Sequence, residues 1–250
     1  MPEALAAALS APGLVWLVLT FLIAGVVRGF TGFGTGLIFM PVAARFIPLA
    51  DAIVVLNVTG ILSLLVLMPR AWREADRGQV GVLALAALAT APLGVMLLTW
   101  LDGGTVRWAL SLAALVTLVA LMAGWRHARR LGWPGLGAVG GAAGVLGGMT
   151  GLSGPPVILF YLSGPGRVAQ VRANTVLFLS VLDAGIIANL FARGLVGMHA
   201  IGLGLLLSVP YLVSVFIGQA LFRPERERAY RHAAYAVIGL AIATGLPLFD

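Results

Sequence analysis

A glycine-rich motif occurs twice in this chain and limits its fold more than any other feature. The first copy, residues 24–41, reads AGVVRGFTGFGTGLIFMP, and the second, residues 143–160, reads AGVLGGMTGLSGPPVILF. The copies align without a gap at an offset of 143 − 24 = 119, close to half of the 250 residues. Glycine permits tight reversals and close approach of backbones. Each copy therefore predicts an apolar helix that is broken in its middle, and Pro155 and Pro156 disfavour continuation of the helix before them.

The composition places this motif in a membrane. Hydrophobic residues make up 60% of the chain and charged residues 10%, whereas soluble domains have about 25% charged residues. Apolar runs of roughly 18 residues or more, the length that spans hydrocarbon, fill most of the sequence. We predict an all-α polytopic membrane protein with a single membrane domain, residues 1–250, made of repeat 1 (about 13–126) and repeat 2 (about 135–248). Pro92 and Pro210, 210 − 92 = 118 residues apart, lie inside matching spans.

The arginines predict the topology of the two broken segments. Leu14–Phe46 and Leu136–Leu162 are each shorter than the roughly 40 residues that two crossings require. If each is a re-entrant hairpin, the arginines divide twelve against three between the two sides, the bias expected of a cytoplasmic and an outer face. We therefore predict six full crossings, two re-entrant hairpins, an inverted second half and periplasmic termini. The twelve are Arg70, Arg73, Arg77, Arg126, Arg129, Arg130, Arg167, Arg172, Arg223, Arg226, Arg228 and Arg231, and the three are Arg45, Arg107 and Arg193.

The two breaks are the candidate binding site. Broken helices that meet near the midplane form the substrate sites of many secondary transporters, and helix starts there favour an anionic group. An alternative is that the glycines only allow close helix packing. The candidate substrate-binding residues are Arg28, Gly29, Thr31, Gly32, Gly34, Thr35, Gly36, Asn57, Gly148, Thr150, Gly151, Ser153, Gly154, Pro155, Pro156 and Asn174.

Two charged residues lie inside apolar segments, where charge is costly and often functional. Arg28 opens the first break, and its counterpart in the second copy is Gly147. Its guanidinium either holds a sulfonate or carboxylate through paired donors, or snorkels to the interface or pairs structurally. Asp183 lies within a span and has three open roles. It pairs with Arg28, takes up a proton to couple transport, or forms a structural hydrogen bond.

Amides and tyrosines in the spans also have alternative roles. Asn57, Asn174 and Asn189 either line a cavity or join helices by hydrogen bonds, and we favour helix joining. Tyr161 and Tyr211 are either gates or interfacial residues, and we favour the interfacial interpretation.

The composition also bears on other functions. The chain has no cysteine, which excludes thiolate metal sites and thiol catalysis, and its three histidines lack the spacing of paired ligands on one helix. It has no GxxxxGK[ST] motif, so a gradient rather than bound nucleotide is expected to drive any transport. We expect no cofactor, no metal and no nucleic-acid partner.

The motif resembles that of a known family. GGMTGLSGPPVILFYL, residues 147–162, with the weaker copy RGFTGFGTGLIFMPV before it, resembles the sulfite exporter TauE/SafE family, also described as 4-toluene sulfonate uptake permeases. The resemblance covers about residues 14–246. It implies movement of sulfite, sulfonates or other small sulfur-containing or organic anions across the bacterial inner membrane. Members often have adjacent glycines in the first motif, whereas here Gly32, Gly34 and Gly36 are separated.

These observations predict a secondary transporter for a small organic or sulfur-containing anion, exposed alternately to each side at the two breaks. The expected partners are the anion, lipid, and a proton or cation for coupling. Two alternatives are open: a membrane scaffold or assembly protein without transport, and an intramembrane enzyme. The enzyme would need convergent acids or metal ligands, yet Asp183 is the only acidic residue inside a predicted span.

Overall fold

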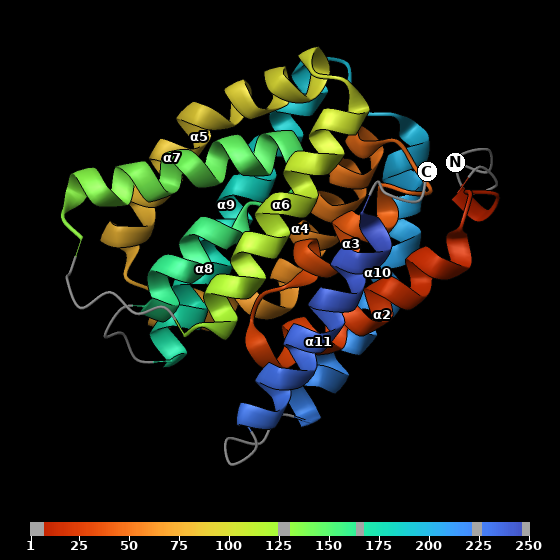
Figure 1. The fold of residues 1–250 in the computed structure, drawn as a ribbon. Helices are drawn as coiled ribbons and strands as arrows, with labels where there is room; N and C mark the ends of the chain where they lie inside the picture. Colours follow the sequence, from red (N-terminus) through yellow and green to blue (C-terminus); the bar gives the residue numbers. More distant parts are fainter. Residues whose placement is uncertain (1–7, 125–130, 164–167, 222–226, 247–250) are drawn as a thin grey trace.

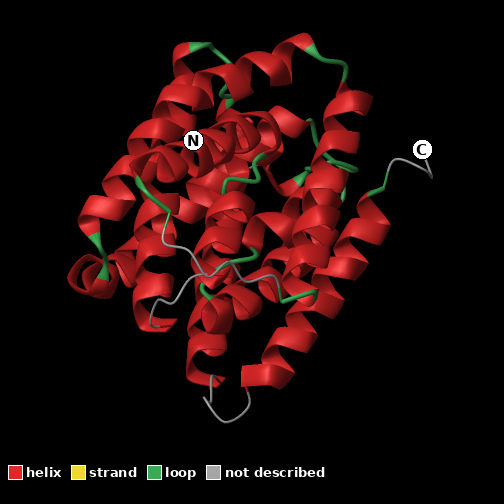
Figure 2. Ribbon diagram, turned by 60° about the vertical axis from the view of Figure 1, so that its left-hand side comes forward, coloured by secondary structure: helices red, strands yellow, loops and turns green. Residues whose placement is uncertain are grey.

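The computed structural model describes residues 8–124, 131–163, 168–221 and 227–246. The regular elements of these residues are all helices (Figure 2). The all-α fold class is thereby confirmed. The helices, labelled in Figure 1, are α2 (Leu14–Thr31), α3 (Thr35–Ala43), α4 (Leu49–Glu74), α5 (Arg77–Trp100), α6 (Gly103–Met122), α7 (Trp133–Thr150), α8 (Gly154–Ser163), α9 (Val168–Ala192), α10 (Met198–Leu221) and α11 (Glu227–Gly245).

The first break is shorter than the motif suggests. α2 continues through Arg28 and ends at Thr31, and Gly32 follows with a left-handed backbone (φ 83°) and donates its N–H to the Arg28 carbonyl at 2.8 Å. The Thr31 hydroxyl bonds the Val27 carbonyl at 2.8 Å and accepts the Phe33 N–H at 3.2 Å. Gly34, also left-handed at φ 99°, then leads into α3. Two glycines and one threonine are thus sufficient to reverse the chain.

The second break uses the same design. Gly151 has φ 75° and donates to the Gly147 carbonyl at 2.9 Å. The Thr150 hydroxyl bonds the Leu146 carbonyl at 2.8 Å and accepts the Leu152 N–H at 3.3 Å. Pro155 lies in the first turn of α8 rather than in the gap. Proline is tolerated there because first-turn N–H groups have no partner within the helix.

Helices in the two halves of the chain begin, and in one case also end, at positions separated by the offset of the sequence repeat. α2 and α7 begin at residues 14 and 133 and end at 31 and 150, while α3 and α8 begin at 35 and 154, and α4 and α9 at 49 and 168. Each difference is 119 residues. The duplicated motif therefore corresponds to a duplicated helix pattern, while the limits of the two repeats and their inversion across the bilayer stay predictions.

The broken pairs pack against helices of the opposite half. α2 lies along α10 and α7 lies along α5, with α4 and α9 in contact between them (Figure 1). A Cβ added at Gly29 would lie 2.7 Å from the Gly218 Cα, and a Cβ at Gly148 would lie 3.1 Å from the Gly94 Cα. Gly29 and Gly148 differ by 119, but Gly94 and Gly218 differ by 218 − 94 = 124. Pro92 and Pro210, 118 apart, are therefore not equivalent in this packing.

The first broken segment is folded back on itself. Backbone atoms of Gly13, before α2, pack against the ring of Phe46, after α3. The rings of Phe21 and Phe39, one on each limb, have centroids 4.1 Å apart. Its two ends therefore meet, as a hairpin requires; the depth of this hairpin in a bilayer stays a prediction.

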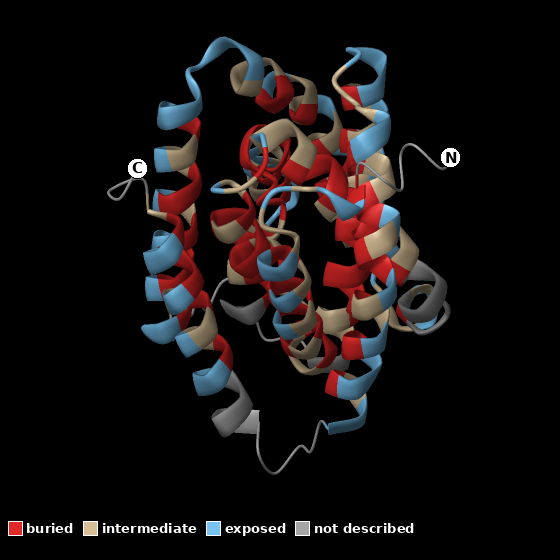
Figure 3. Cartoon of the chain, turned by 90° about the vertical axis from the view of Figure 1, so that its right-hand side faces the viewer, coloured by how far each residue is buried: buried red, intermediate tan, exposed pale blue. Residues whose placement is uncertain are grey.

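Five helices are long and apolar enough to cross a membrane, judged over the described residues: α2, α5, α6, residues 170–192 of α9, and α10. Exposed residues face outward and buried residues line the interior in Figure 3, and large apolar side chains such as Leu112, Val209 and Val213 are exposed. The protein is therefore a multi-pass membrane protein. α2, which we assigned to a hairpin, is among the five.

The apolar stretches of α4 and α11 are shorter, Leu49–Ser63 and His232–Gly245, within the described part of the chain. The count of six crossings is thus still a prediction. Part of the arginine pattern behind it lies outside the described residues, namely Arg126, Arg129, Arg130, Arg167, Arg223 and Arg226.

Candidate anion site

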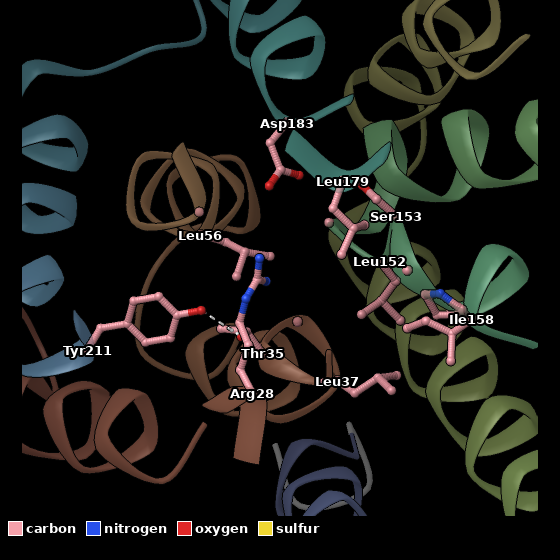
Figure 4. A pocket seen from close by; sticks show the side chains of 16 residues that line it. Arg28, Thr35, Leu37, Leu56, Leu152, Ser153, Ile158, Leu179, Asp183 and Tyr211 are labelled. Atoms are coloured by element: carbon pink, nitrogen blue, oxygen red, sulfur yellow. Dashed lines mark hydrogen bonds between the residues drawn. The ribbon is translucent and has the colours of Figure 1, made fainter. Parts of the chain in front are cut away.

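The two breaks meet at a small cavity, shown in Figure 4. A Cβ added at Gly36 would lie 3.4 Å from the Gly151 carbonyl oxygen, so the breaks touch through their backbones. The cavity volume is about 50 Å³, against the roughly 10–15 Å³ that one water molecule requires. Nine of the predicted residues line it: Arg28, Gly34, Thr35, Gly36, Gly151, Ser153, Gly154, Pro155 and Asp183.

Arg28 extends from the last turn of α2 into this cavity. Its side chain is 6% exposed, which contradicts the interpretation that it snorkels to the interface. Its Nε atom is buried and has no hydrogen-bond partner. A buried guanidinium nitrogen without a partner is costly, and an oxyanion in the cavity would satisfy it through charge-assisted hydrogen bonds.

Asp183, on α9, lines the same cavity from the opposite side. Its Oδ2 would lie 2.6 Å from a Cβ added at Gly60, so the glycine on α4 makes room for the carboxylate. Figure 4 shows the guanidinium of Arg28 directed towards this carboxylate. Among the described residues no ion pair closes between the two side chains. A positive and a negative group therefore share one cavity without neutralising each other directly.

Tyr211, on α10, also lines the cavity, although sequence reasoning favoured an interfacial position. That interpretation is wrong, because the side chain is 0% exposed and its Oη lies 2.9 Å from the Thr35 Oγ1. The available signal was its place near the middle of an apolar span rather than at an end. The lining residues that sequence reasoning missed are Leu37, Leu56, Gly60, Leu152, Ile158, Leu179 and Tyr211.

Two helix starts border the cavity with different numbers of backbone donors. α3 presents Thr35, Gly36 and Leu37 in its first turn, and α8 begins with Gly154. First-turn N–H groups lack partners within the helix and carry a partial positive charge. The next residues of α8 are prolines and have no N–H, so α3 is the richer donor.

Other predicted site residues have structural contacts away from the cavity. Gly29 and Gly148 pack α2 against α10 and α7 against α5, as the packing alternative proposed. Thr31 and Thr150 use their hydroxyls to end their own helices. Gly32 packs against the side chain of Arg172, whose Nη2 donates to the Gly29 carbonyl at 3.0 Å.

The remaining predicted residues are Asn57, Asn174 and Pro156, which do not line the cavity. The Nδ2 of Asn57 donates to the Ile53 carbonyl one turn earlier at 2.6 Å. The Oδ1 of Asn174 accepts the Asp76 N–H at 2.7 Å, which ties α9 to the start of α5. Asn174 thus joins helices, the role we favoured for it.

The fold and the cavity together define a multi-pass membrane protein with a small cavity between two broken helices, lined by charged, hydroxyl and apolar side chains. Residues 17–246, nearly the whole chain, match the family described as Sulfite exporter TauE/SafE. The chain therefore belongs to the sulfite exporter TauE/SafE family, a family of transporters, as its motif predicted.

One relative comes from Cupriavidus necator and is named "Probable sulfite/organosulfonate exporter TauE". It is 26% identical over 226 residues, which cover 87% of this chain and 88% of the relative. No solved structure gives a significant match to the chain.

Proposed function

We propose that this protein is a secondary transporter that moves a small organic or sulfur-containing anion, such as sulfite or a sulfonate, across the bacterial inner membrane. The anion binds in the cavity between the breaks, which opens alternately to each side. Membership of an exporter family supports transport of an anion, and the relative's name contains sulfite and organosulfonate. The broken helices beside the cavity supply elements whose movement would change access.

The observation that carries this proposal is the environment of Arg28. Its guanidinium is buried, its Nε lacks a partner, and it enters a cavity bordered by the start of α3. Each of these features favours a negative charge at that place. Leu37, Leu152 and Ile158 complete the wall with apolar surface, which strengthens electrostatic interactions by excluding water.

Transport of radiolabelled sulfite and methanesulfonate by protein in liposomes tests the proposal. Arg28→Ala is expected to lower transport about a hundredfold, since it removes charge-assisted bonds worth about 1.5–3 kcal/mol and leaves the carboxylate of Asp183 without a counter-charge. The matched control is Arg193→Ala, an exposed arginine whose Nε bonds the Asn189 Oδ1 at 3.1 Å. Full transport by Arg28→Ala would contradict the proposal.

Asp183 is the proposed coupling residue. A carboxylate that shares a cavity with Arg28 and the anion can exchange a proton as the anion enters or leaves. Asp183→Asn is expected to retain exchange of labelled for unlabelled anion but to lose uphill movement driven by a pH gradient. Uphill transport by Asp183→Asn at the wild-type rate would assign coupling elsewhere.

The same assay addresses the alternatives. We infer that the anion crosses without chemical change, so the recovered label should be the original compound. Chemical conversion would support an intramembrane enzyme. Absence of both transport and anion binding would support a scaffold protein.

A further inference from the structure

A hydrogen bond links α10 to the first break. The Tyr211 Oη and the Thr35 Oγ1 lie 2.9 Å apart, and both residues line the cavity. We propose that Tyr211 is a positioning residue for the anion: its hydroxyl donates to Thr35, and the Thr35 hydroxyl donates to the anion. This inference rests on the proposed transport function and names how the same site recognises its ligand.

The direction of this relay follows from the donors available. A hydroxyl has one hydrogen to donate and two lone pairs that accept. An anion only accepts, so the Thr35 hydrogen is free for it only when Thr35 accepts from Tyr211. Hydrogen bonds in a chain polarise one another, and the effect is larger where water is excluded. Thr35 is 3% exposed and Tyr211 is 0% exposed, so this condition is met.

The packing of Tyr211 fixes the position of its hydroxyl. Its ring meets the Phe21 ring edge-on, with centroids 5.3 Å apart at 72°, and Phe21 also contacts Phe39 on α3. Its carbonyl accepts the Ser214 hydroxyl at 2.8 Å. Tyr211 therefore contacts both limbs of the first hairpin, which limits its rotation and holds its Oη at Thr35.

Among the described residues of the second half, the equivalent positions form no such relay. A Cβ at Gly25 would approach the carbonyl of Tyr211, and a Cβ at the equivalent Gly144 would approach the carbonyl of Ala87. Ala87 thus occupies the position of Tyr211, and Gly154 that of Thr35. Tight packing does not itself require a tyrosine at this place, because alanine serves in the second half.

The experiment measures sulfite and methanesulfonate dissociation constants by equilibrium binding to purified protein, with KM and maximal rate from liposomes. Thr35→Val is expected to raise the dissociation constant about tenfold. Tyr211→Phe, which keeps the ring, should raise it severalfold at an unchanged maximal rate. The double variant should bind as Thr35→Val alone does, because Tyr211 acts through Thr35. Thr35→Ser should bind like the wild type.

The matched control is Tyr235→Phe, which removes a hydroxyl that bonds the Leu121 carbonyl at 3.3 Å, away from the cavity. It should leave both KM and maximal rate unchanged. Losses that multiply in the double variant, or unchanged binding by Tyr211→Phe, would overturn the relay while leaving the transport function in place. If the wild-type protein bound neither anion, the proposed function and the relay would fail together.

Discussion

The two breaks have the same backbone and different chemistry. Each ends a helix with a threonine and a left-handed glycine, and each is followed by a short helix that begins at the cavity. The first break presents Arg28 and Thr35 to the cavity. The equivalent positions in the second are Gly147 and Gly154, and a Cβ at Gly147 would collide with the Ser153 Oγ.

This difference shows that the repeated motif provides the backbone shape of the site, whereas single residues provide its charged and hydroxyl groups. Glycines and threonines shape two helix breaks that touch at a cavity, and this backbone shape uses no charged side chain. The charged and hydroxyl groups then come mainly from the first break, α9 and α10. We infer that the second break contributes a surface of backbone and small side chains against which the anion is held.

We expect the largest effect, a loss of stability, from substitution of the glycines that pack helices at equivalent positions in the two halves. A Cβ at Gly148 would lie 2.9 Å from the Val95 N, and a Cβ at Gly29 would lie 2.8 Å from the Gln219 N. These contacts are with backbone, which cannot move aside easily. Gly29→Ala and Gly148→Ala should therefore each destabilise the protein by about 1–3 kcal/mol or more. The measurement is the yield and thermal midpoint of detergent-extracted protein.

The control for this pair is Gly137→Ala, also on α7, where a Cβ would meet nothing within 4 Å. It should leave the yield unchanged or slightly higher, because alanine favours a helix over glycine by about 1 kcal/mol. A normal yield for Gly148→Ala with a poor yield for Gly29→Ala would break the equivalence of the two packing contacts.

A smaller effect, on anion affinity, should reveal the chemical difference between the two breaks. Ser153→Ala removes the hydroxyl that the second break presents to the cavity, whereas Thr35→Val removes the hydroxyl that the first break presents to it. We expect no more than about a fivefold change in anion affinity for Ser153→Ala, since the loss of a neutral hydrogen bond is worth about 1 kcal/mol or less. A loss as large as that of Thr35→Val would show that both breaks bind through side chains.

We expect the smallest effect, on thermal stability, at the start of α6 in the first half. Asp102 precedes α6 and accepts the Thr105 N–H and hydroxyl, both at 2.7 Å. These hydrogen bonds lower the pKa of Asp102 from its ordinary value of 3.8. The stabilisation is therefore present above that value and is lost as pH falls through the lower folded-state pKa.

Asp102→Ala tests this cap. It should reduce the thermal midpoint slightly at neutral pH and by less in acid, with anion transport unchanged. A larger deficit in acid than at neutral pH would contradict the capping role of the carboxylate. The start of α5 has the same kind of cap, since the Asp76 Oδ1 accepts the Gln79 N–H at 3.1 Å, whereas its counterpart α10 begins after Gly197, which has no such side chain.

Sequence reasoning identified the parts of the fold that depend on local chemistry. The composition indicated the membrane, and the repeated glycines and threonines indicated where helices break. Eight motif residues surround one cavity because residues at a break lie close together whatever their neighbours are, and Asp183 joins them from α9. The sequence did not distinguish glycines that turn the chain, such as Gly32, from those that pack helices, such as Gly29.

The sequence pattern could not predict which residues of distant helices come into contact. Tyr211 meets Thr35 across 176 positions because α10 packs on α2 in a register that only the folded chain fixes. The spacing of Pro92 and Pro210 suggested an offset of 118, but the glycine contacts of α5 and α10 give 124. A shift of this size rotates a helix, so lining residues cannot be read from the repeat.

Chemical protection of a cysteine in the cavity tests the central claim most directly. The chain has no cysteine, so Ser153→Cys introduces a single thiol in the second break, opposite Arg28. We predict that sulfite slows modification of this thiol by a small hydrophilic reagent, and that adding Arg28→Ala abolishes the protection. Equal modification rates with and without sulfite, in a variant that still transports it, would contradict an anion site between the breaks.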